Sequence, residues 1–197
     1  SGNYAYVASN SSGLSIIGIG DPSNPTLIDS HSTATSNTTS RANGVAVKDN
    51  YAYVADVYSG LVIMDITNPS SPLSVGSYNT THANGVAVKD NYAYIADGRN
   101  GLVVLNITDQ TNPTFTGWGN TSYAHDLVIS GNYVYVADDS NGVVIFNVTN
   151  PAEPIQEGYY NTAGYAYDVA VANNYVYVAD FGNGLVILRV EGADDTT

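Results

Sequence analysis

The sequence predicts an all-β protein, a β-propeller of about five blades with four antiparallel strands per repeat and incomplete terminal blades. A seven-residue motif, NYAYVAD or a close variant of it, begins at Asn3, Asn50, Asn91, Asn132 and Asn174, with a period of about 41 residues. A period of that length indicates one structural unit repeated along the chain. Each unit holds four short runs rich in Val, Ile, Tyr, Leu and Thr, and turn-forming residues interrupt every run before a helical spacing develops.

Composition restricts the class of protein further. Hydrophobic residues make up 44% of the 197 residues and charged residues only 12%, which favours a packed core over a disordered chain. The 18 acidic residues against five Lys and Arg give a net charge of −13, which argues against nucleic acid as a partner. No apolar run approaches the roughly 20 residues of a membrane helix, so we expect no membrane insertion. The chain contains no Cys, and it begins at SGNY without a basic and apolar leader, so a secretory signal is absent or already removed.

The order of the predicted strands shows why the terminal blades are incomplete. In the unit that starts at Gly85, strand A is GVAV, strand B lies in NYAYIAD, strand C is GLVVL and strand D follows Pro113. The chain starts at a strand B and stops after a strand C, so its blades read BCD, ABCD, ABCD, ABCD and ABC. We treat residues 1–197 as a single domain with repeats at approximately 3–49, 50–90, 91–131, 132–173 and 174–197.

This strand order leaves three architectures open. The chain forms a five-bladed ring with two short blades, or it is a fragment of a larger ring, or its subunits complete one another head to tail. In the last case unpaired strand positions at the two ends accept strands of the neighbouring subunit. A head-to-tail contact that does not close generates a filament.

The repeated motif has a packing interpretation and a binding interpretation. Because side chains alternate along a strand, Tyr51 and Tyr53 point to one face of the blade and Ala52 and Val54 to the other. We favour packing, in which the tyrosine rings of one blade fill the space beside the small residues of the next. The alternative is an aromatic platform for sugars.

The motif ends in an aspartate that is followed four residues later by Gly, which is typical of a hairpin turn rather than of catalysis. These aspartates are Asp56, Asp97, Asp138 and Asp180.

Three longer segments carry a resemblance to a known family. They are GLVIMDITNPSSP from Gly60, GLVVLNITDQTNP from Gly101 and GVVIFNVTNPAEP from Gly142. Together with YVAD and with AHDLVISGN from Ala124, they resemble the LVIVD repeat family over the whole chain. The resemblance implies a β-propeller of the kind found in large bacterial and archaeal surface proteins, and it brings no catalytic residues. The first unit departs most, because SIIGIGDPSNP replaces the usual strand and turn and a longer Ser- and Thr-rich connection follows it.

Six Asn-x-Ser/Thr sequences are candidate N-glycosylation sites. They lie at Asn10, Asn37, Asn79, Asn106, Asn120 and Asn147. Two pairs, Asn79 with Asn120 and Asn106 with Asn147, repeat with the period of the blades and fall on the expected outer rim. The alternative is that Asn-x-Thr suits strand ends and turns.

Catalytic and metal sites have little support in the sequence. The three histidines, His31, His82 and His125, occupy different places in the repeat, and no catalytic or metal-binding string of known spacing is present. We therefore predict no enzyme, no catalytic residue and no cofactor. The one candidate for a bound calcium ion is the pair Asp126 and Asp168, which stands at the head of strand A where earlier units have Gly; a hydrogen-bonded or solvated pair is the alternative.

These observations predict a non-enzymatic, extracellular or cell-surface structural protein. We expect it to self-associate head to tail as the building block of a surface layer, adhesive stalk or filament, with the Asn-x-Ser/Thr sequences as candidate sites for N-linked glycans. One alternative is a propeller module that binds surface carbohydrates or proteins through loops on one face. A third, less favoured alternative is a propeller glycosidase or lyase, for which the sequence offers no matched acid and base.

Overall fold

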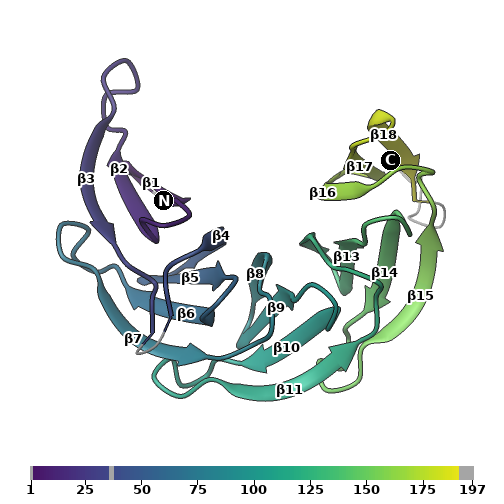
Figure 1. The fold of residues 1–197 in the computed structure, drawn as a ribbon, viewed down its shortest axis with the longest axis horizontal. Helices are drawn as coiled ribbons and strands as arrows, with labels where there is room; N and C mark the ends of the chain where they lie inside the picture. Colours follow the sequence, from purple (N-terminus) through teal and green to yellow (C-terminus); the bar gives the residue numbers. More distant parts are fainter. Residues whose placement is uncertain (1, 36–37, 191–197) are drawn as a thin grey trace.

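The computed structural model describes residues 2–35 and 38–190, and these residues form β-strands and turns only. The 18 strands are arranged in five antiparallel sheets (Figure 1). The described residues therefore confirm the all-β class. They contain no helix that is long and apolar enough to cross a membrane.

The sheets follow one another along the chain. The first sheet contains β1 (Tyr4–Ala8), β2 (Leu14–Gly18) and β3 (Thr26–His31). The second contains β4 (Ala42–Lys48), β5 (Tyr51–Asp56), β6 (Gly60–Asp65) and β7 (Leu73–Tyr78). The third contains β8 (Gly85–Lys89), β9 (Tyr92–Ala96), β10 (Leu102–Asn106) and β11 (Thr114–Gly119). The fourth contains β12 (Asp126–Ser130), β13 (Tyr133–Ala137), β14 (Val143–Asn147) and β15 (Ile155–Tyr160). The fifth contains β16 (Ala166–Ala172), β17 (Tyr175–Asp180) and β18 (Gly184–Arg189).

Each sheet is a simple up-and-down array whose strands are neighbours in the order of the sequence. In the middle three sheets these strands take the predicted positions A to D, with A on the concave side of the molecule and D on the convex side (Figure 1). The first sheet has strands B, C and D, and the fifth has A, B and C. The predicted strand order is confirmed in the described residues.

The five sheets form an open arc and not a closed ring (Figure 1). The first and fifth sheets stand at the two ends of the arc, separated by a gap. Consecutive strands A, namely β4, β8, β12 and β16, contact one another along the inner side. The five-bladed ring, one of the three architectures that the sequence leaves open, is therefore not seen in the described residues of this chain, because the end sheets stand apart.

Contacts between sheets follow the alternation of the repeated motif. Tyr53 is 2% exposed and packs in one cluster with Ala93 and Ile95 of the next sheet. Its phenol group hydrogen-bonds with Gln110, and burial raises its pKa above the usual value. On the opposite side of the same strand, Ala52 and Val54 are fully buried against the first sheet. We call the side that carries the motif tyrosines the tyrosine face of a sheet, and the opposite side its alanine face.

Every neighbouring pair of sheets repeats this arrangement. Tyr94 lies in a cluster with Val134 and Val136 of the fourth sheet, and Tyr135 lies in a cluster with Val176 and Val178 of the fifth. Burial raises the pKa of Tyr94 to about 12. The packing interpretation of the motif is thus confirmed for the inner sheets.

The divergent first unit also packs as a regular sheet. Leu14 and Ile16 on β2 are fully buried in the cluster formed with Ala52 and Val54 of the second sheet. Burial of the alternate residues of β2 is enough to preserve the interface, although the connection after β3 differs in length and composition from the others.

Candidate functional site

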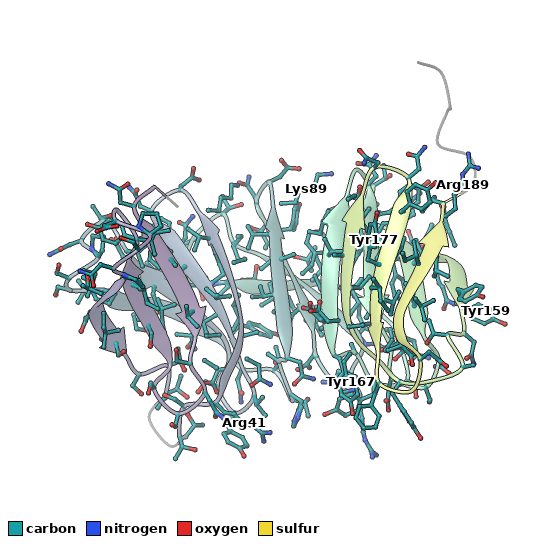
Figure 2. The ribbon with its side chains drawn as sticks, turned by 90° about the horizontal axis from the view of Figure 1, so that it is seen from above. Arg41, Lys89, Tyr159, Tyr167, Tyr177 and Arg189 are labelled. Atoms are coloured by element: carbon teal, nitrogen blue, oxygen red, sulfur yellow. The ribbon has the colours of Figure 1, made fainter. Side chains whose placement is uncertain are left out.

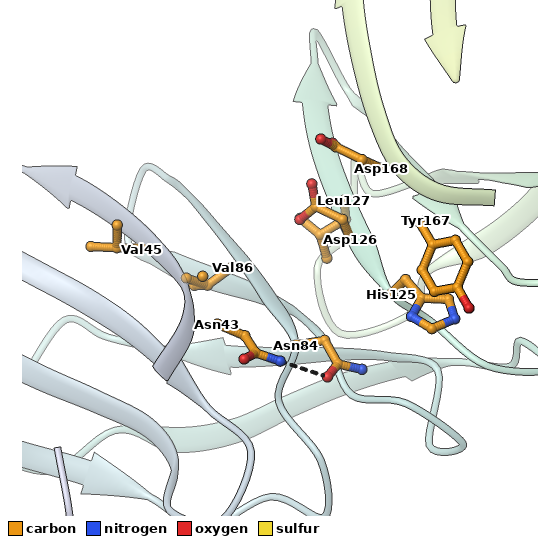
Figure 3. Close-up of a pocket in the computed structure, with 10 residues that line it drawn as sticks. Asn43, Val45, Asn84, Val86, His125, Asp126, Leu127, Tyr167 and Asp168 are labelled. Atoms are coloured by element: carbon orange, nitrogen blue, oxygen red, sulfur yellow. Dashed lines mark hydrogen bonds between the residues drawn. The ribbon is translucent and has the colours of Figure 1, made fainter. Parts of the chain in front are cut away.

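The inner strands enclose a polar hollow of about 520 Å³ at one edge of the sheets (Figure 3). Its lining residues come from the beginnings of β4, β8, β12 and β16 and from the connections that precede them: Asn43, Gly44, Val45, Asn84, Val86, His125, Asp126, Leu127, Tyr167 and Asp168. The sequence placed only Asp126 and Asp168 at this position. The convergence of the remaining side chains depends on the curvature of the arc.

Glycine allows the strand heads to approach one another closely. A Cβ atom at Gly44 would lie 2.9 Å from the carbonyl oxygen of Asn84, and one at Gly85 would overlap the Asp126 carboxylate. The amide of Asn43 donates to Asn84 at 3.4 Å, and that of Asn84 donates to the carbonyl of Ala124 at 3.0 Å. The second, third and fourth sheets are therefore linked in sequence along the rim of the hollow.

Asp126 and Asp168 face the hollow together, as the sequence predicted (Figure 3). Burial raises the pKa of Asp126 to about 7, and a hydrogen bond with the Asp168 carboxyl and the charge of that group add to the effect. One proton shared between the two carboxyls gives a donor and an acceptor side by side near neutral pH. This arrangement is the hydrogen-bonded alternative to a calcium site.

A metal site has little support from the geometry. Within the described parts of the chain, no group of three or more His, Asp or Glu side chains could hold a metal ion. Calcium requires six to eight oxygen ligands, and the carboxyls of Asp126 and Asp168 supply only a small part of such a shell. The described residues thus place two carboxyls beside each other with no third His, Asp or Glu ligand next to them.

A row of aromatic side chains lies next to the hollow, and the sequence did not predict it. Ring centroids are 5.9 Å apart for His82 and Tyr123, 4.8 Å for Tyr123 and His125, and 4.4 Å for His125 and Tyr167. Phe181 extends the row at 6.3 Å from Tyr167. The two histidines hold different places in the repeat, so only the side-by-side packing of the D–A connections brings them into one row. Figure 2 shows Tyr167 and Arg41 at this edge of the sheets and Lys89 and Arg189 at the opposite edge.

His125 is the titratable member of the row. Burial lowers its pKa, while Asp139, whose carboxylate lies 3.7 Å from Nε2, opposes the shift. The imidazole is therefore mainly neutral at pH 7 and presents one donor and one acceptor. With the carboxyls and amides of the hollow, this edge of the protein is suited to hydrogen bonding with a small polar molecule.

The aspartates that end the repeated motif have a structural role that extends beyond the hairpin. All four are at most 3% exposed: Asp56, Asp97, Asp138 and Asp180. Asp97 accepts hydrogen bonds from the backbone N–H groups of Thr81 and His82, at 3.2 and 2.6 Å. Asp138 accepts the corresponding pair one repeat later, at 3.0 and 2.6 Å. These carboxylates fix the D–A connection to the sheet that follows it, a role that the spacing alone did not reveal.

The glycosylation candidates fall into two structural groups. Asn10, Asn79 and Asn120 are exposed in turns or directly after a strand D. Asn106 and Asn147 are half-buried, and the side-chain oxygen of each accepts the backbone N–H two residues later, at 2.8 and 2.9 Å. Asp65 makes the same bond at 2.8 Å one repeat earlier, which indicates that this position serves a turn. Asn37 lies outside the described residues.

Comparison with protein families gives a match that covers most of the chain. The family model described as the LVIVD repeat matches residues 1–33, 40–80, 81–121, 122–162 and 163–190. A search of the curated proteins found no match.

Solved structures with similar folds include one natural enzyme and two designed proteins. The periplasmic gluconolactonase of Pseudomonas aeruginosa gives a TM-score of 0.77 at 14% identity, over 95% of this chain and 63% of that chain. The computationally designed Ika8 protein gives 0.71 at 11% identity, over 96% of this chain and 56% of that one. The designed Ika4 protein gives 0.61 at 11% identity, over 80% of this chain and 96% of that one. At these identities the likeness concerns the fold alone, and the chain spans well under two thirds of the Ika8 chain and just under that share of the gluconolactonase.

Proposed function

The chain belongs to the LVIVD repeat family, and from that premise we propose that it is a non-enzymatic structural protein of the cell surface. Its copies associate head to tail into a surface layer, stalk or filament. The single observation that carries the proposal is the open arc, in which the first and fifth sheets stand apart at unlike ends and, among the described residues, share no strand pairing. An array with two unlike ends extends by repeating one contact.

The charge of the chain is compatible with an exposed surface protein. A net charge of −13 keeps copies soluble and apart at low ionic strength, and salt reduces this repulsion within a Debye length of about 8 Å at physiological ionic strength. We therefore expect association to strengthen as salt is added. N-linked glycans at Asn79 and Asn120 belong to the same proposal, because both residues are exposed and follow β7 and β11 directly at equivalent positions in neighbouring sheets.

Sedimentation velocity of the purified chain over a wide range of concentration, with and without added salt, tests this proposal. We expect a series of species that grows with concentration, together with regular polymers in electron micrographs of the same samples. Labelling of intact source cells with a membrane-impermeant reagent tests the location. A monomer at every concentration and salt, or a protein protected from the reagent, would contradict the proposal.

A second candidate function rests on the polar hollow and the aromatic row. Asn, Asp, His and Tyr side chains gather there at one edge, which suits a carbohydrate or another polyhydroxylated ligand. A glycan array tests this function: saturable binding that is lost in Tyr167→Ala but kept in Tyr159→Ala would favour a binding module. Tyr159 is a matched control, because it is 70% exposed and lies on β15, away from the hollow.

A further inference from the structure

We propose that copies of this chain join face to face, with the tyrosine face of the fifth sheet docked on the alanine face of the first sheet of a second copy. The inference rests on the proposed head-to-tail assembly and names the surfaces that carry it. It differs from pairing of strand edges, which was the mode expected from the sequence.

The inner interfaces of the molecule provide the template for this contact. Along the tyrosine face of the second sheet, Tyr53 pairs with Ile63 and Ala55 pairs with Leu61 across β5 and β6. The exposed fraction of these side chains is 2% for Tyr53 and zero for the other three. They are covered by the alanine face of the third sheet, including Ala93 and Ile95.

The fifth sheet has the same face, and none of the described residues covers it. Tyr177 pairs with Ile187 and Ala179 pairs with Leu185 across β17 and β18, in the same register as in the second sheet. Leu185 is 64% exposed and Ile187 is 54% exposed, although their counterparts in the second sheet are fully buried. Tyr175 at the start of β17 is 42% exposed. A contiguous set of large apolar side chains is thus accessible on this face.

The first sheet has the complementary face, also without a cover. Ala5 and Val7 on β1 stand where the second sheet has Ala52 and Val54. Val7 is 39% exposed, whereas Val54 is fully buried against the first sheet. Ile19, which follows β2, is 37% exposed. The small residues of this face leave the space that tyrosine rings fill at each inner interface.

Among residues 2–35 and 38–190, the outer faces of the first and fifth sheets lack the polar covering that repeat proteins commonly use to stay soluble. Terminal repeats of such arrays normally carry polar outer faces. Here the exposed faces keep the aromatic and aliphatic residues of the inner repeats. At each inner interface of the same chain, a tyrosine face like that of the fifth sheet is covered by an alanine face like that of the first sheet. The occupant that fits both faces is therefore a second copy of this chain.

The contact is heterologous and does not close in one plane. Figure 1 shows the first and fifth sheets of one copy on opposite sides of a single gap, so a second copy that continued the arc in the same plane would run into the first sheet of its neighbour. The next copy must be displaced along the axis of the arc. Repetition of one such contact produces a helical filament.

Two variants with one blocked face each test the proposal. Ile187→Glu places a charge on the tyrosine face of the fifth sheet, and Val7→Glu places one on the alanine face of the first sheet. Ile155→Glu is the matched control, because Ile155 is 57% exposed on β15 and belongs to neither face. Thermal unfolding followed by circular dichroism verifies that all three variants fold, and Leu185→Gln provides a second, milder block of the tyrosine face.

Sedimentation velocity of the variants alone and in pairs gives the decisive result. We expect Ile187→Glu and Val7→Glu each to remain monomeric, with the dissociation constant raised at least about tenfold, which corresponds to about 1.4 kcal/mol. Ile155→Glu should polymerise like the unmodified chain. An equimolar mixture of the two blocked variants should form dimers and nothing larger, because it contains one intact pair of faces.

The possible failures separate this inference from the proposed function. Polymers that persist in both blocked variants would overturn face docking but leave head-to-tail assembly in place, with strand pairing as its mode. Loss of association in Ile187→Glu alone would indicate a symmetric contact between two tyrosine faces and would also overturn the inference. An unmodified chain that stays monomeric at all concentrations would contradict both.

Discussion

The second and fifth sheets carry nearly the same motif and place it in different environments. Tyr53 in YAYVAD is 2% exposed, whereas Tyr177 in YVYVAD is only half-buried and its cross-strand partner Ile187 is 54% exposed. The strand register is the same in both sheets, with Tyr53 opposite Ile63 and Tyr177 opposite Ile187. The motif therefore determines which face a residue occupies, and the presence of a following sheet determines whether that face is buried.

Glycine shows the same contrast between inner and terminal sheets. Gly142 and Gly184 hold equivalent places in the B–C hairpin, with φ of +80° and +74°. A Cβ atom at Gly142 would overlap the carbonyl oxygen of Tyr160, because a strand D and its D–A connection cross the hairpin there. In the part of the chain that the structure describes, nothing lies within 4 Å of such an atom at Gly184.

The largest expected effect tests burial of the tyrosine face. Tyr53→Ala should lower the free energy of unfolding by about 3–5 kcal/mol, since it removes a buried aromatic ring and leaves a cavity between two sheets. Tyr177→Ala should cost less than about 1 kcal/mol, because water already reaches that face. Urea unfolding of dilute, monomeric samples measures both values. Equal losses in the two variants would show that the fifth sheet is covered in solution.

The hairpin glycines provide the next largest difference. Gly142→Ala should cost more than about 2 kcal/mol, because a positive φ and a backbone clash both oppose the new side chain. Gly184→Ala should cost about 1–2 kcal/mol, since only the positive φ opposes it. Melting temperatures of the two variants measure the difference, and a Gly142→Ala variant as stable as Gly184→Ala would contradict the crossing of the hairpin by its D–A connection.

A smaller effect depends on pH and involves the contact between the fourth and fifth sheets. The pKa of Asp126 is about 7 in the folded protein, above the value of about 3.9 in an unfolded chain. The stability contributed by the protonated carboxyl is therefore present near pH 4 and is lost as the pH rises through 7. Asp126→Asn should therefore raise the free energy of unfolding at pH 8 by on the order of 1–2 kcal/mol and change it little at pH 4.

Urea unfolding at both pH values measures this prediction. The wild-type protein should become less stable relative to the variant between pH 5 and pH 8. A gain in stability of the same size at pH 4 and pH 8 would mean that the carboxyl of Asp126 keeps an ordinary pKa in the folded state. Added calcium that stabilises the wild type but not Asp126→Asn would instead support a cation between Asp126 and Asp168.

The smallest expected effect concerns a turn that inner sheets share. Asn106→Asp should change stability by less than about 0.5 kcal/mol, because Asp65 already makes the same bond to the backbone N–H two residues later. Asn106→Ala should cost about 1 kcal/mol through loss of that bond. Both variants remove the glycosylation sequence, so intact-mass measurement of protein from the native host shows at the same time whether Asn106 carries a glycan.

The period, the strand order and the pairing of large with small faces could all be predicted from the sequence. Each depends on local alternation and on spacing, as in the Tyr51–Val54 run and the hairpin from Asp56 to Gly60. The angle between successive sheets could not be predicted, because it results from many small contacts such as the approach of Gly44 to Asn84. That angle opens the arc and leaves the end faces exposed.

The candidate site could be predicted only in part, for the same reason. Asp126 and Asp168 hold equivalent places in consecutive repeats, so their proximity follows from the period. His82 and His125 hold non-equivalent places, and they join one aromatic row only because Tyr123 lies between them. The role of Asp97 could be predicted only in part, as a hairpin residue. Its further partners, the backbone N–H groups of Thr81 and His82, lie in a connection of no recognisable sequence pattern.

Electron cryomicroscopy of the unmodified chain at high concentration and physiological ionic strength tests the central claim most directly. We predict filaments in which β16, β17 and β18 of one copy stack on β1, β2 and β3 of the next, with Tyr177 and Ile187 buried at the junction. Isolated particles in which the first and fifth sheets of a single copy close into a ring would contradict it.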